Sequence, residues 1–286
     1  MRLRSLLFVP GDSEKKAAKA AGCGADALIF DLEDSVAASA KDAARSLTAS
    51  LVAGGPRIWS TIVRVNPFDS GRTAEDLAAV VRPGLDAIML PKASGGHDVT
   101  RLAEALDRLE FSAGMAPGSV GIIPIATETP AAIFALSSYA PPHPRLAGLT
   151  WGAEDLAAAV GASGNRDEAG EWTQPYALVR SLTLFAATAA QVAPIDTLHA
   201  DFRDLDGLVR DSRRARRDGF VGRLAIHPVQ VEVINRCFTP SEAEVEWAKR
   251  IVEAFAENPE AGTLGLDGKM IDRPHLIAAR KTLASR

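Results

Sequence analysis

Polar and charged side chains follow most of the short apolar runs of this sequence, at the positions where reactive groups gather in α/β proteins. They comprise acids, two basic side chains, an amide and a histidine: Asp31, Glu33, Asp34, Arg64, Asn66, Lys92, Glu128, Glu154, Asp155 and His227. Any one of them could simply solvate the rim of a fold. Carboxylates that converge in one cleft repel each other, however, unless a cation or a proton lies between them. The pattern therefore predicts a charged site.

Glu128 and Asp155 follow two successive apolar runs, and their carboxylates could meet at one hard cation. Oxygen ligands without a nearby cysteine or histidine favour Mg2+ or Mn2+ over zinc. Mg2+ commonly takes only one or two carboxylates and leaves positions for water or substrate oxygens. We therefore predict that Glu128 and Asp155 bind a divalent metal ion.

Arg64 and Lys92 are the basic side chains of this set. If its strand alternates regularly, Arg64 points into the mouth of the fold with a guanidinium fork suited to a carboxylate or an enolate oxygen. The competing interpretation is an ion pair between Arg64 and Glu33 or Asp34. Lys92 has the same two interpretations, substrate binding or ion pairing.

A helix is expected to begin within GAEDLAAAVG, which would leave free backbone N–H groups at Gly152, Ala153 and Glu154. Such groups can bind a substrate carboxylate because the positive end of the helix dipole lies there. The competing interpretation makes Asp155 a plain acidic residue at a helix start. The polar, Gly-rich stretch at residues 161–173 is a candidate substrate loop.

Eight short runs rich in Ile, Leu and Val alternate with Ala-rich amphipathic stretches long enough for crossover helices, which is the pattern of βα units around a parallel sheet. The runs are residues 5–10, 27–33, 62–66, 87–92, 121–128, 146–152, 194–199 and 222–228. Eight such units favour a closed (β/α)8 TIM barrel over an open doubly wound sheet. In a barrel the polar residues would meet at the carboxyl ends of the strands.

The chain continues past the eighth run with elements that a barrel does not need. Thr239-Pro240-Ser241-Glu242 predicts a capping box and a proline at the first helical position, opening a helix to about residue 256. Residues 258–268 break the pattern, and a last amphipathic helix is expected over residues 273–283. We therefore expect a catalytic barrel domain at residues 1–256 and a C-terminal helical extension at residues 257–286.

Composition limits the classes of function. Of the 286 residues, 47% are hydrophobic and 24% charged, which is ordinary for a globular protein, and the net charge of −4 disfavours nucleic acid as a partner. The two cysteines, Cys23 and Cys237, have no zinc or disulfide spacing, which fits the cytoplasm. No signal peptide or membrane span is indicated, so small molecules are the expected partners.

Ordered motifs that span nearly the whole chain carry a family resemblance. They are RSLLFVPGD (4–12), GADALIFDLEDSV (24–36), VRVNP (63–67), LPKA (90–93), IATETP (125–130), GLTWGAEDL (148–156), DFRDLDGL (201–208), AIHPVQVEVIN (225–235) and DGKMID (267–272). Together they resemble the citrate lyase beta subunit (citryl-CoA lyase) family, with the malyl-CoA and citramalyl-CoA lyases.

The resemblance implies a Mg2+-dependent carbon–carbon lyase that cleaves a 3-hydroxyacyl-CoA thioester to acetyl-CoA and a 2-keto acid by reverse Claisen chemistry. Glu128 and Asp155 would be the metal ligands, and Arg64 would bind the keto acid. Asp272 would be the catalytic acid/base, delivered by the C-terminal segment of a neighbouring subunit in a homo-oligomer, a trimer or a hexamer. By its own position, Asp272 is typical of the N-cap of the last helix.

This sequence departs from the family pattern at residues 13–16, where relatives commonly carry arginine. Ser13, Glu14, Lys15 and Lys16 stand there, so Lys15, Lys16 or Lys19 would contact the CoA phosphates. Three other functions stay open. They are a malate-synthase-like condensation with thioester hydrolysis, a CoA-independent metal aldolase of pyruvate type, and a citrate lyase subunit that works on an acyl-carrier thioester.

Overall fold

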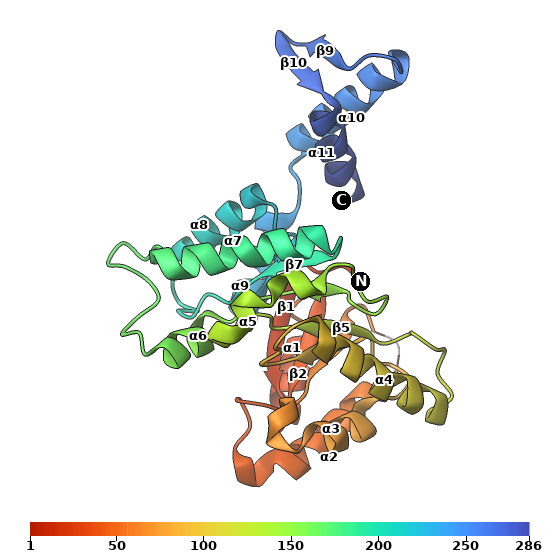
Figure 1. Cartoon of the computed structure of the whole chain (residues 1–286), viewed down its shortest axis with the longest axis vertical. Helices are drawn as coiled ribbons and strands as arrows, with labels where there is room; N and C mark the ends of the chain where they lie inside the picture. The colour runs from red at the N-terminus through yellow and green to blue at the C-terminus, as the bar shows by residue number, and fades with distance from the viewer. Residues whose placement is uncertain (56, 286) are drawn as a thin grey trace. The chain divides into compact units, whose positions relative to one another are not determined.

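The computed structural model describes residues 1–55 and 57–285 (Figure 1). The chain divides into two compact units, Met1–Asn235 and Arg236–Arg286. The first unit holds the eight parallel strands, and the second is built from helices and a short hairpin. The functional division into a catalytic domain of residues 1–256 and a tail of residues 257–286 stays a prediction.

The first unit is a parallel barrel whose strands follow the order β5-β4-β3-β2-β1-β8-β7-β6. The strands are β1 (Ser5–Pro10), β2 (Ala27–Asp31), β3 (Ser60–Arg64), β4 (Ala87–Leu90), β5 (Gly121–Pro124), β6 (Gly148–Leu149), β7 (Ala193–Asp196) and β8 (Gly222–Ala225). Parallel bridges from Ile122 to Leu146 and from Ile125 to Thr150 join the two ends of this sheet. The predicted (β/α)8 barrel is confirmed, and the open sheet is wrong.

Each predicted run overlaps one strand, but every strand except β1 ends earlier than predicted. Asp31 and Arg64 therefore end their strands, whereas the other polar residues lie after the strands, in loops or at the start of α6. Helices separate the strands: α1 (Glu14–Ala21), α2 (Lys41–Val52), α3 (Thr73–Val80), α4 (Gly96–Ser112), α5 (Pro130–Phe134), α6 (Ala153–Val160), α7 (Gln174–Ala189), α8 (Leu205–Asp218) and α9 (Pro228–Phe238). Short 3-10 turns add η1 (Ala38–Ala40), η2 (Phe68–Ser70) and η3 (Leu136–Tyr139).

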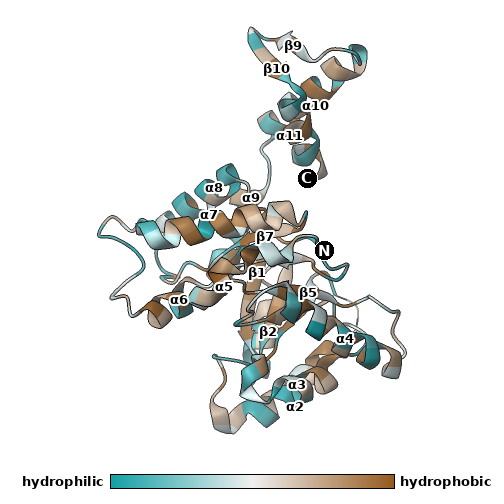
Figure 2. Ribbon diagram, in the orientation of Figure 1, coloured by the Kyte–Doolittle hydropathy of each residue, from teal (hydrophilic) through white to brown (hydrophobic). Residues whose placement is uncertain are grey.

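The barrel interior is filled by apolar side chains from all around the sheet, most of them branched. They include Leu3, Leu6, Ala27, Ile29, Ile62, Ala87, Met89, Ile123, Ile125, Ile195 and Leu224, with Phe8 and Leu198 packed against them. Strands β2 and β4 are buried at every residue, because the barrel core covers one face and the helices cover the other. This explains the continuous apolar runs in the sequence. Helix α8, by contrast, is largely hydrophilic (Figure 2).

The second unit packs α10 (Glu242–Glu257) and α11 (Arg273–Ala284) around a hairpin of β9 (Thr263–Leu266) and β10 (Lys269–Asp272). Its own core comprises Ala248, Ile251, Phe255, Ile271, Leu276 and Ala279. The hairpin corrects the predicted break at residues 258–268. Its turn residues Asp267 and Gly268 adopt φ of 50° and 73°, as a two-residue hairpin turn requires.

The start of α10 also differs from the prediction. Ser241, not Thr239, is the N-cap, and its side chain and that of Glu244 form the capping box. Thr239 cannot take this role because α9 continues to Phe238, immediately before it. Pro240 therefore lies in the short connection before the cap, outside the helix.

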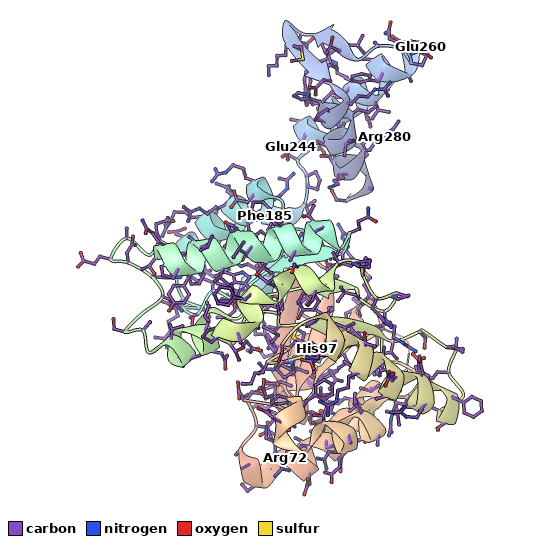
Figure 3. All side chains as sticks on the ribbon, viewed as in Figure 1. Arg72, His97, Phe185, Glu244, Glu260 and Arg280 are labelled. Atoms are coloured by element: carbon purple, nitrogen blue, oxygen red, sulfur yellow. The ribbon has the colours of Figure 1, made fainter. Side chains whose placement is uncertain are left out.

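The helix surfaces of the first unit carry some exposed apolar side chains. Leu178 and Phe185 of α7 are 59% and 65% exposed, and Phe185 can be located on this helix in Figure 3. Their spacing of seven residues places both on one side of the helix. None of the described helices is both long enough and apolar enough to cross a membrane.

Pairing of β1 with β8 requires the absence of a side chain at Gly222. A Cβ atom there would lie 1.7 Å from the carbonyl oxygen of Leu3. We expect Gly222→Ala to lower the free energy of unfolding by about 3 kcal/mol, because strand backbone must move to relieve this overlap. Urea denaturation checks this. Gly22→Ala is the matched control, since a Cβ there meets nothing within 4 Å, and an equal loss in both variants would contradict the account.

Candidate active site

A cavity of about 360 Å3 opens at the carboxyl ends of the barrel strands. Its lining is drawn from the ends of β1, β2, β3, β5, β6, β7 and β8 and from the start of α6: Phe8, Pro10, Asp31, Asp34, Ser35, Arg64, Ile125, Glu128, Trp151, Gly152, Ala153, Glu154, Asp155, Thr197, Leu198, Leu224 and Ile226. The cavity therefore brings together Arg64, Glu128, Gly152, Ala153 and Asp155, the predicted site residues of the barrel, apart from Lys92.

Arg64 is held by two acids, Asp31 at the end of β2 and Glu33 in the loop after it. Its Nε and Nη2 atoms donate to the two oxygens of Asp31, at 2.7 Å each, and its Nη1 lies 3.0 Å from Glu33 Oε2. Of the two predicted partners, Glu33 is therefore correct, whereas Asp31 takes the place of Asp34. Each terminal nitrogen of a guanidinium carries a second N–H, so Arg64 keeps donors for a substrate oxygen.

The charge of Arg64 keeps its main partner ionised. Burial on its own would raise the pKa of Asp31, but the hydrogen bonds and the charge of Arg64 outweigh burial and hold that pKa below its usual range. The pKa of Glu33 is raised, because burial outweighs the charges of Arg64 and Lys92. The Arg64 guanidinium also lies over the Phe8 ring, 4.8 Å from the ring centre, and this contact helps to hold the guanidinium in place.

Lys92 lies in a cluster of acids next to the cavity. Its ammonium group donates to Glu33, and it lies 3.8 Å from Asp34 and 3.6 Å from Asp155. Burial would lower the pKa of Lys92, but the hydrogen bond and charge of Glu33 and the charges of Glu128 and Asp34 outweigh burial and raise it. Ion pairing, the second interpretation of Lys92, is therefore what the structure shows for this side chain.

The carboxylate of Glu128 is fixed by backbone on both sides. One oxygen accepts the backbone N–H of Lys92, whose φ of 51° lies in the left-handed region. On the other side, a Cβ at Gly152 would lie 2.6 Å from Glu128 Cγ, so only glycine leaves room there. Glu128 is 3% exposed, and burial raises its pKa to about 8, with the charges of Asp155 and Glu33 adding to the effect.

Glu128 and Asp155 together suit a hard divalent cation. Among the described residues, no group of three or more His, Cys, Asp or Glu side chains is arranged to hold a metal. Mg2+ does not need such a group, because it commonly takes one or two carboxylates and completes its shell with other oxygens. The glycine at position 152 lets the Glu128 carboxylate lie against the start of α6, which carries Asp155 in its first turn.

The start of α6 is held against the barrel by aromatic packing. Trp151, fully buried, packs with Leu156 of α6 and Tyr176 of α7 in one cluster, and its indole N–H donates to Asp196 at 2.7 Å. Gly152 is the N-cap of α6 and uses no side chain for capping. The first backbone N–H groups of the helix therefore begin at the wall of the cavity, as predicted.

The predicted loop at residues 161–173 is connected to this wall. Arg166 lies 3.7 Å from the centre of the Trp172 ring and pairs with Asp211 of α8 at 2.6 Å. Trp172 in turn meets Trp151 edge to face, with 5.0 Å between ring centres. The loop therefore contributes to the position of Trp151, which lines the cavity.

Two other polar residues from the strand ends have structural partners instead. Asn66 donates to Asp76 of α3 and accepts from Lys41 of α2, and His227 stacks on Phe202 with 4.7 Å between ring centres. The sequence placed Asp31 among the strand-end acids without giving it a partner, and it gave no role to Trp151, although both lie in the family motifs. The pairing of β2 with β3 identifies Asp31 as the partner of Arg64, because the two residues lie side by side in the strand register.

Asp272 belongs to the second unit, where it ends β10 and is the N-cap of α11. Its carboxylate contacts His275 Nδ1, and the hydrogen bond from His275 lowers the pKa of Asp272. The N-cap that its position in the sequence predicted is therefore present. Neighbouring Met270 is 64% exposed, so this end of the hairpin presents an open surface.

Known proteins resemble this chain over nearly its whole length. Residues 4–228 match the HpcH/HpaI aldolase/citrate lyase family. A (3S)-malyl-CoA thioesterase of Cereibacter sphaeroides is 36% identical over 98% of this chain and 93% of the relative. The citrate lyase subunit beta of Escherichia coli K12 is also 36% identical, over 98% of this chain and 92% of the relative.

A solved structure shares both fold and sequence. Protein CitE from Mycobacterium tuberculosis, in complex with magnesium, acetoacetate and coenzyme A, matches with a TM-score of 0.78 and 33% identity, covering 99% of this chain and 98% of that one. The family match, the relatives and the barrel with its acidic mouth agree. The chain belongs to the HpcH/HpaI aldolase/citrate lyase family.

Proposed function

We propose that this protein is a Mg2+-dependent carbon–carbon lyase that cleaves a 3-hydroxyacyl-CoA thioester to acetyl-CoA and a 2-keto acid. The observation that carries the proposal is the pair Glu128 and Asp155, which line one cavity together with the Arg64 guanidinium. Binding of magnesium and coenzyme A by a relative of the same fold supports the cofactor and the thioester. Citryl, malyl and citramalyl thioesters are the candidate substrates.

Glu128 and Asp155 would hold the metal ion, and their carboxylates are the oxygen donors that Mg2+ prefers. Mg2+, when bound, would act as a Lewis acid towards the oxygens of the keto acid portion. The backbone N–H groups at Gly152 and Ala153 would bind the substrate carboxylate at the start of α6. Lys92 would keep the surrounding acids in place through its contacts with Glu33 and Asp155.

Arg64 would stabilise the negative charge that develops during cleavage. A base takes the proton of the 3-hydroxyl group, C3 becomes the carbonyl carbon of the keto acid as its bond to C2 breaks, and the electron pair of that bond passes to the thioester as an enolate. Because Asp31 and Glu33 already fix the guanidinium, its remaining N–H donors need no reorganisation when this charge forms. A proton delivered to C2 of the enolate then completes acetyl-CoA.

Asp272 would deliver that proton, or remove it in the condensing direction. Its carboxylate lies in the second unit at the open end of the hairpin, which suits a group that acts on another subunit. A homo-oligomer, a trimer or a hexamer, would bring the residue 257–286 tail of one subunit to the barrel of the next. The exposed apolar side chains of α7 are compatible with assembly.

Exposed lysines of α1 would contact the CoA phosphates. Lys15, Lys16 and Lys19 are all exposed, and α1 begins shortly after Phe8 and Pro10, which line the cavity. Ser13 caps this helix by accepting from the backbone N–H of Lys16. An acyl-carrier thioester is the alternative substrate, because one relative is named as a subunit of citrate lyase.

A thioesterase activity is the second candidate function, because another relative is named a (3S)-malyl-CoA thioesterase. The two reactions differ in their products. Lysis yields one keto acid and one acetyl-CoA per ester, whereas hydrolysis yields free CoA. Incubation with Mg2+ and hydroxyacyl-CoA esters, with keto acid, acetyl-CoA and CoA measured separately, distinguishes them. Free CoA without keto acid would favour the thioesterase and overturn the lyase.

We expect Glu128→Ala and Asp155→Ala each to lower kcat by at least about 100-fold, because each removes a charge and a ligand together. Titration calorimetry should show weakened Mg2+ binding in both variants. Glu154→Ala is the matched control, since Glu154 adjoins Asp155 but binds Asn165. Unchanged Mg2+ affinity in both Glu128→Ala and Asp155→Ala would remove the metal assignment.

We expect Arg64→Lys to lower kcat/KM by about 100-fold although the charge is kept, because an ammonium group cannot hold two acids and a substrate oxygen with a planar fork. Steady-state kinetics measure the loss, and circular dichroism shows whether the barrel is intact. Arg72→Lys, at a half-exposed arginine outside the cavity, is the control. Full activity in Arg64→Lys would make Arg64 a structural residue only.

We expect Asp272→Asn to fold and bind Mg2+ normally but to lose turnover, since the change is nearly isosteric and removes only the proton-transfer group. The measurement is exchange of acetyl-CoA methyl protons with deuterated water in the presence of a keto acid analogue. Asp267→Asn removes a charge from the same hairpin and serves as the control. Undiminished exchange in Asp272→Asn would place the base elsewhere.

Hybrid oligomers test whether Asp272 acts on a neighbour. Arg64→Ala and Asp272→Ala should each be nearly inactive alone. After mixing and subunit exchange we expect part of the activity to return, because some sites then combine an intact Arg64 with an intact Asp272. Absence of recovery, with exchange verified by mass spectrometry of the assemblies, would mean that Asp272 serves its own subunit.

A further inference from the structure

The floor of the cavity is apolar. Phe8, Ile125, Leu198 and Leu224 line the cavity and also pack in the barrel interior, so their upper surfaces close the barrel beneath the site. We call these four side chains the apolar floor. Ile226, at the end of the strand that carries Leu224, extends the same surface and is 37% exposed. These side chains offer only carbon atoms to a substrate group that reaches this surface.

The charged part of the lining is predominantly acidic. The acids are Asp31, Asp34, Glu128, Glu154 and Asp155. Arg64 is the only basic side chain among the described residues of the lining, and it already lies between Asp31 and Glu33. The nearby Lys92 ammonium group is likewise surrounded by acids. The free N–H donors of Arg64 are used by the developing enolate in the proposed reaction, so no second basic side chain of the described lining is left for an additional anion.

These observations bear on the group attached to the carbinol carbon of the substrate. In the proposed reaction this carbon carries one carboxylate and one further group, which is hydrogen in a malyl ester, methyl in a citramalyl ester and carboxymethyl in a citryl ester. In the proposed function, the metal ion and the backbone N–H groups at the start of α6 would bind the first carboxylate. A second carboxylate would have to lie on the apolar floor or beside the acids.

We propose that the side group at the carbinol carbon is hydrogen or a short alkyl group that packs on the apolar floor, and that carboxymethyl is rejected. The inference rests on the proposed lyase function and specifies its substrate class. The natural product is then a keto acid with a single carboxylate. A buried anion without a partner is disfavoured by desolvation and by the neighbouring acids, whereas a methyl group gains apolar contact.

The test compares kcat/KM for citramalyl-CoA, malyl-CoA and citryl-CoA with the wild-type protein and Mg2+. We expect citryl-CoA to be cleaved at least about 100-fold less efficiently than the best of the other two, because several kcal/mol separate a matched from a repelled charge. Equal or preferred cleavage of citryl-CoA would overturn this inference and leave the lyase function intact. Cleavage of none of the three would overturn the lyase function itself, and this inference with it.

A substitution at the edge of the floor gives an independent check. Ile226→Arg adds a guanidinium at a partly exposed position, and we expect the ratio of citryl-CoA to citramalyl-CoA cleavage to rise at least about tenfold. Ile226→Leu is the matched control, because it keeps the surface apolar and should keep the wild-type ratio. The same ratio in both variants, with wild-type Mg2+ affinity in each, would show that the side group does not bind at this surface.

Discussion

The excess of carboxylates at the mouth of the barrel is the constraint on which the site depends. Two like charges about 4 Å apart repel by roughly 4 kcal/mol at an effective dielectric constant near 20, so several acids cannot share one cavity without compensation. Arg64 neutralises Asp31 and Glu33, and Lys92 pairs with Glu33. Glu128, nearly fully buried, accepts a hydrogen bond from the backbone N–H group of Lys92. A bound divalent cation would complete this balance.

The barrel supplies the positions that this balance requires. Asp31 and Arg64 face each other because they end neighbouring strands in register. Glu128 comes from the loop after β5 and Asp155 from the first turn of α6, which follows β6, and β5 and β6 are the two strands at which the barrel closes. The cluster around Trp151 holds the start of α6 against this seam. The strand order therefore brings residues that are far apart in the sequence together in one charged cavity.

The sequence predicts the barrel and its acidic mouth well because both follow from repeated local patterns. It could not choose between the acids of the DLED motif as partners of Arg64, since that choice depends on strand register. The β9–β10 hairpin was missed because its strands are short and only half buried, although Asp267-Gly268 is a turn signal. The proposed role of Asp272 has no local signature, since its N-cap position accounts for the residue on its own.

A crystal of the protein grown with Mn2+ in place of Mg2+ gives the most direct test of the central claim. Anomalous scattering from manganese locates the ion without reference to activity. The account predicts one strong peak bound by carboxylate oxygens of both Glu128 and Asp155, with Arg64 still between Asp31 and Glu33. A cavity that holds no manganese at saturating concentration, or a peak bound by neither carboxylate, would contradict it.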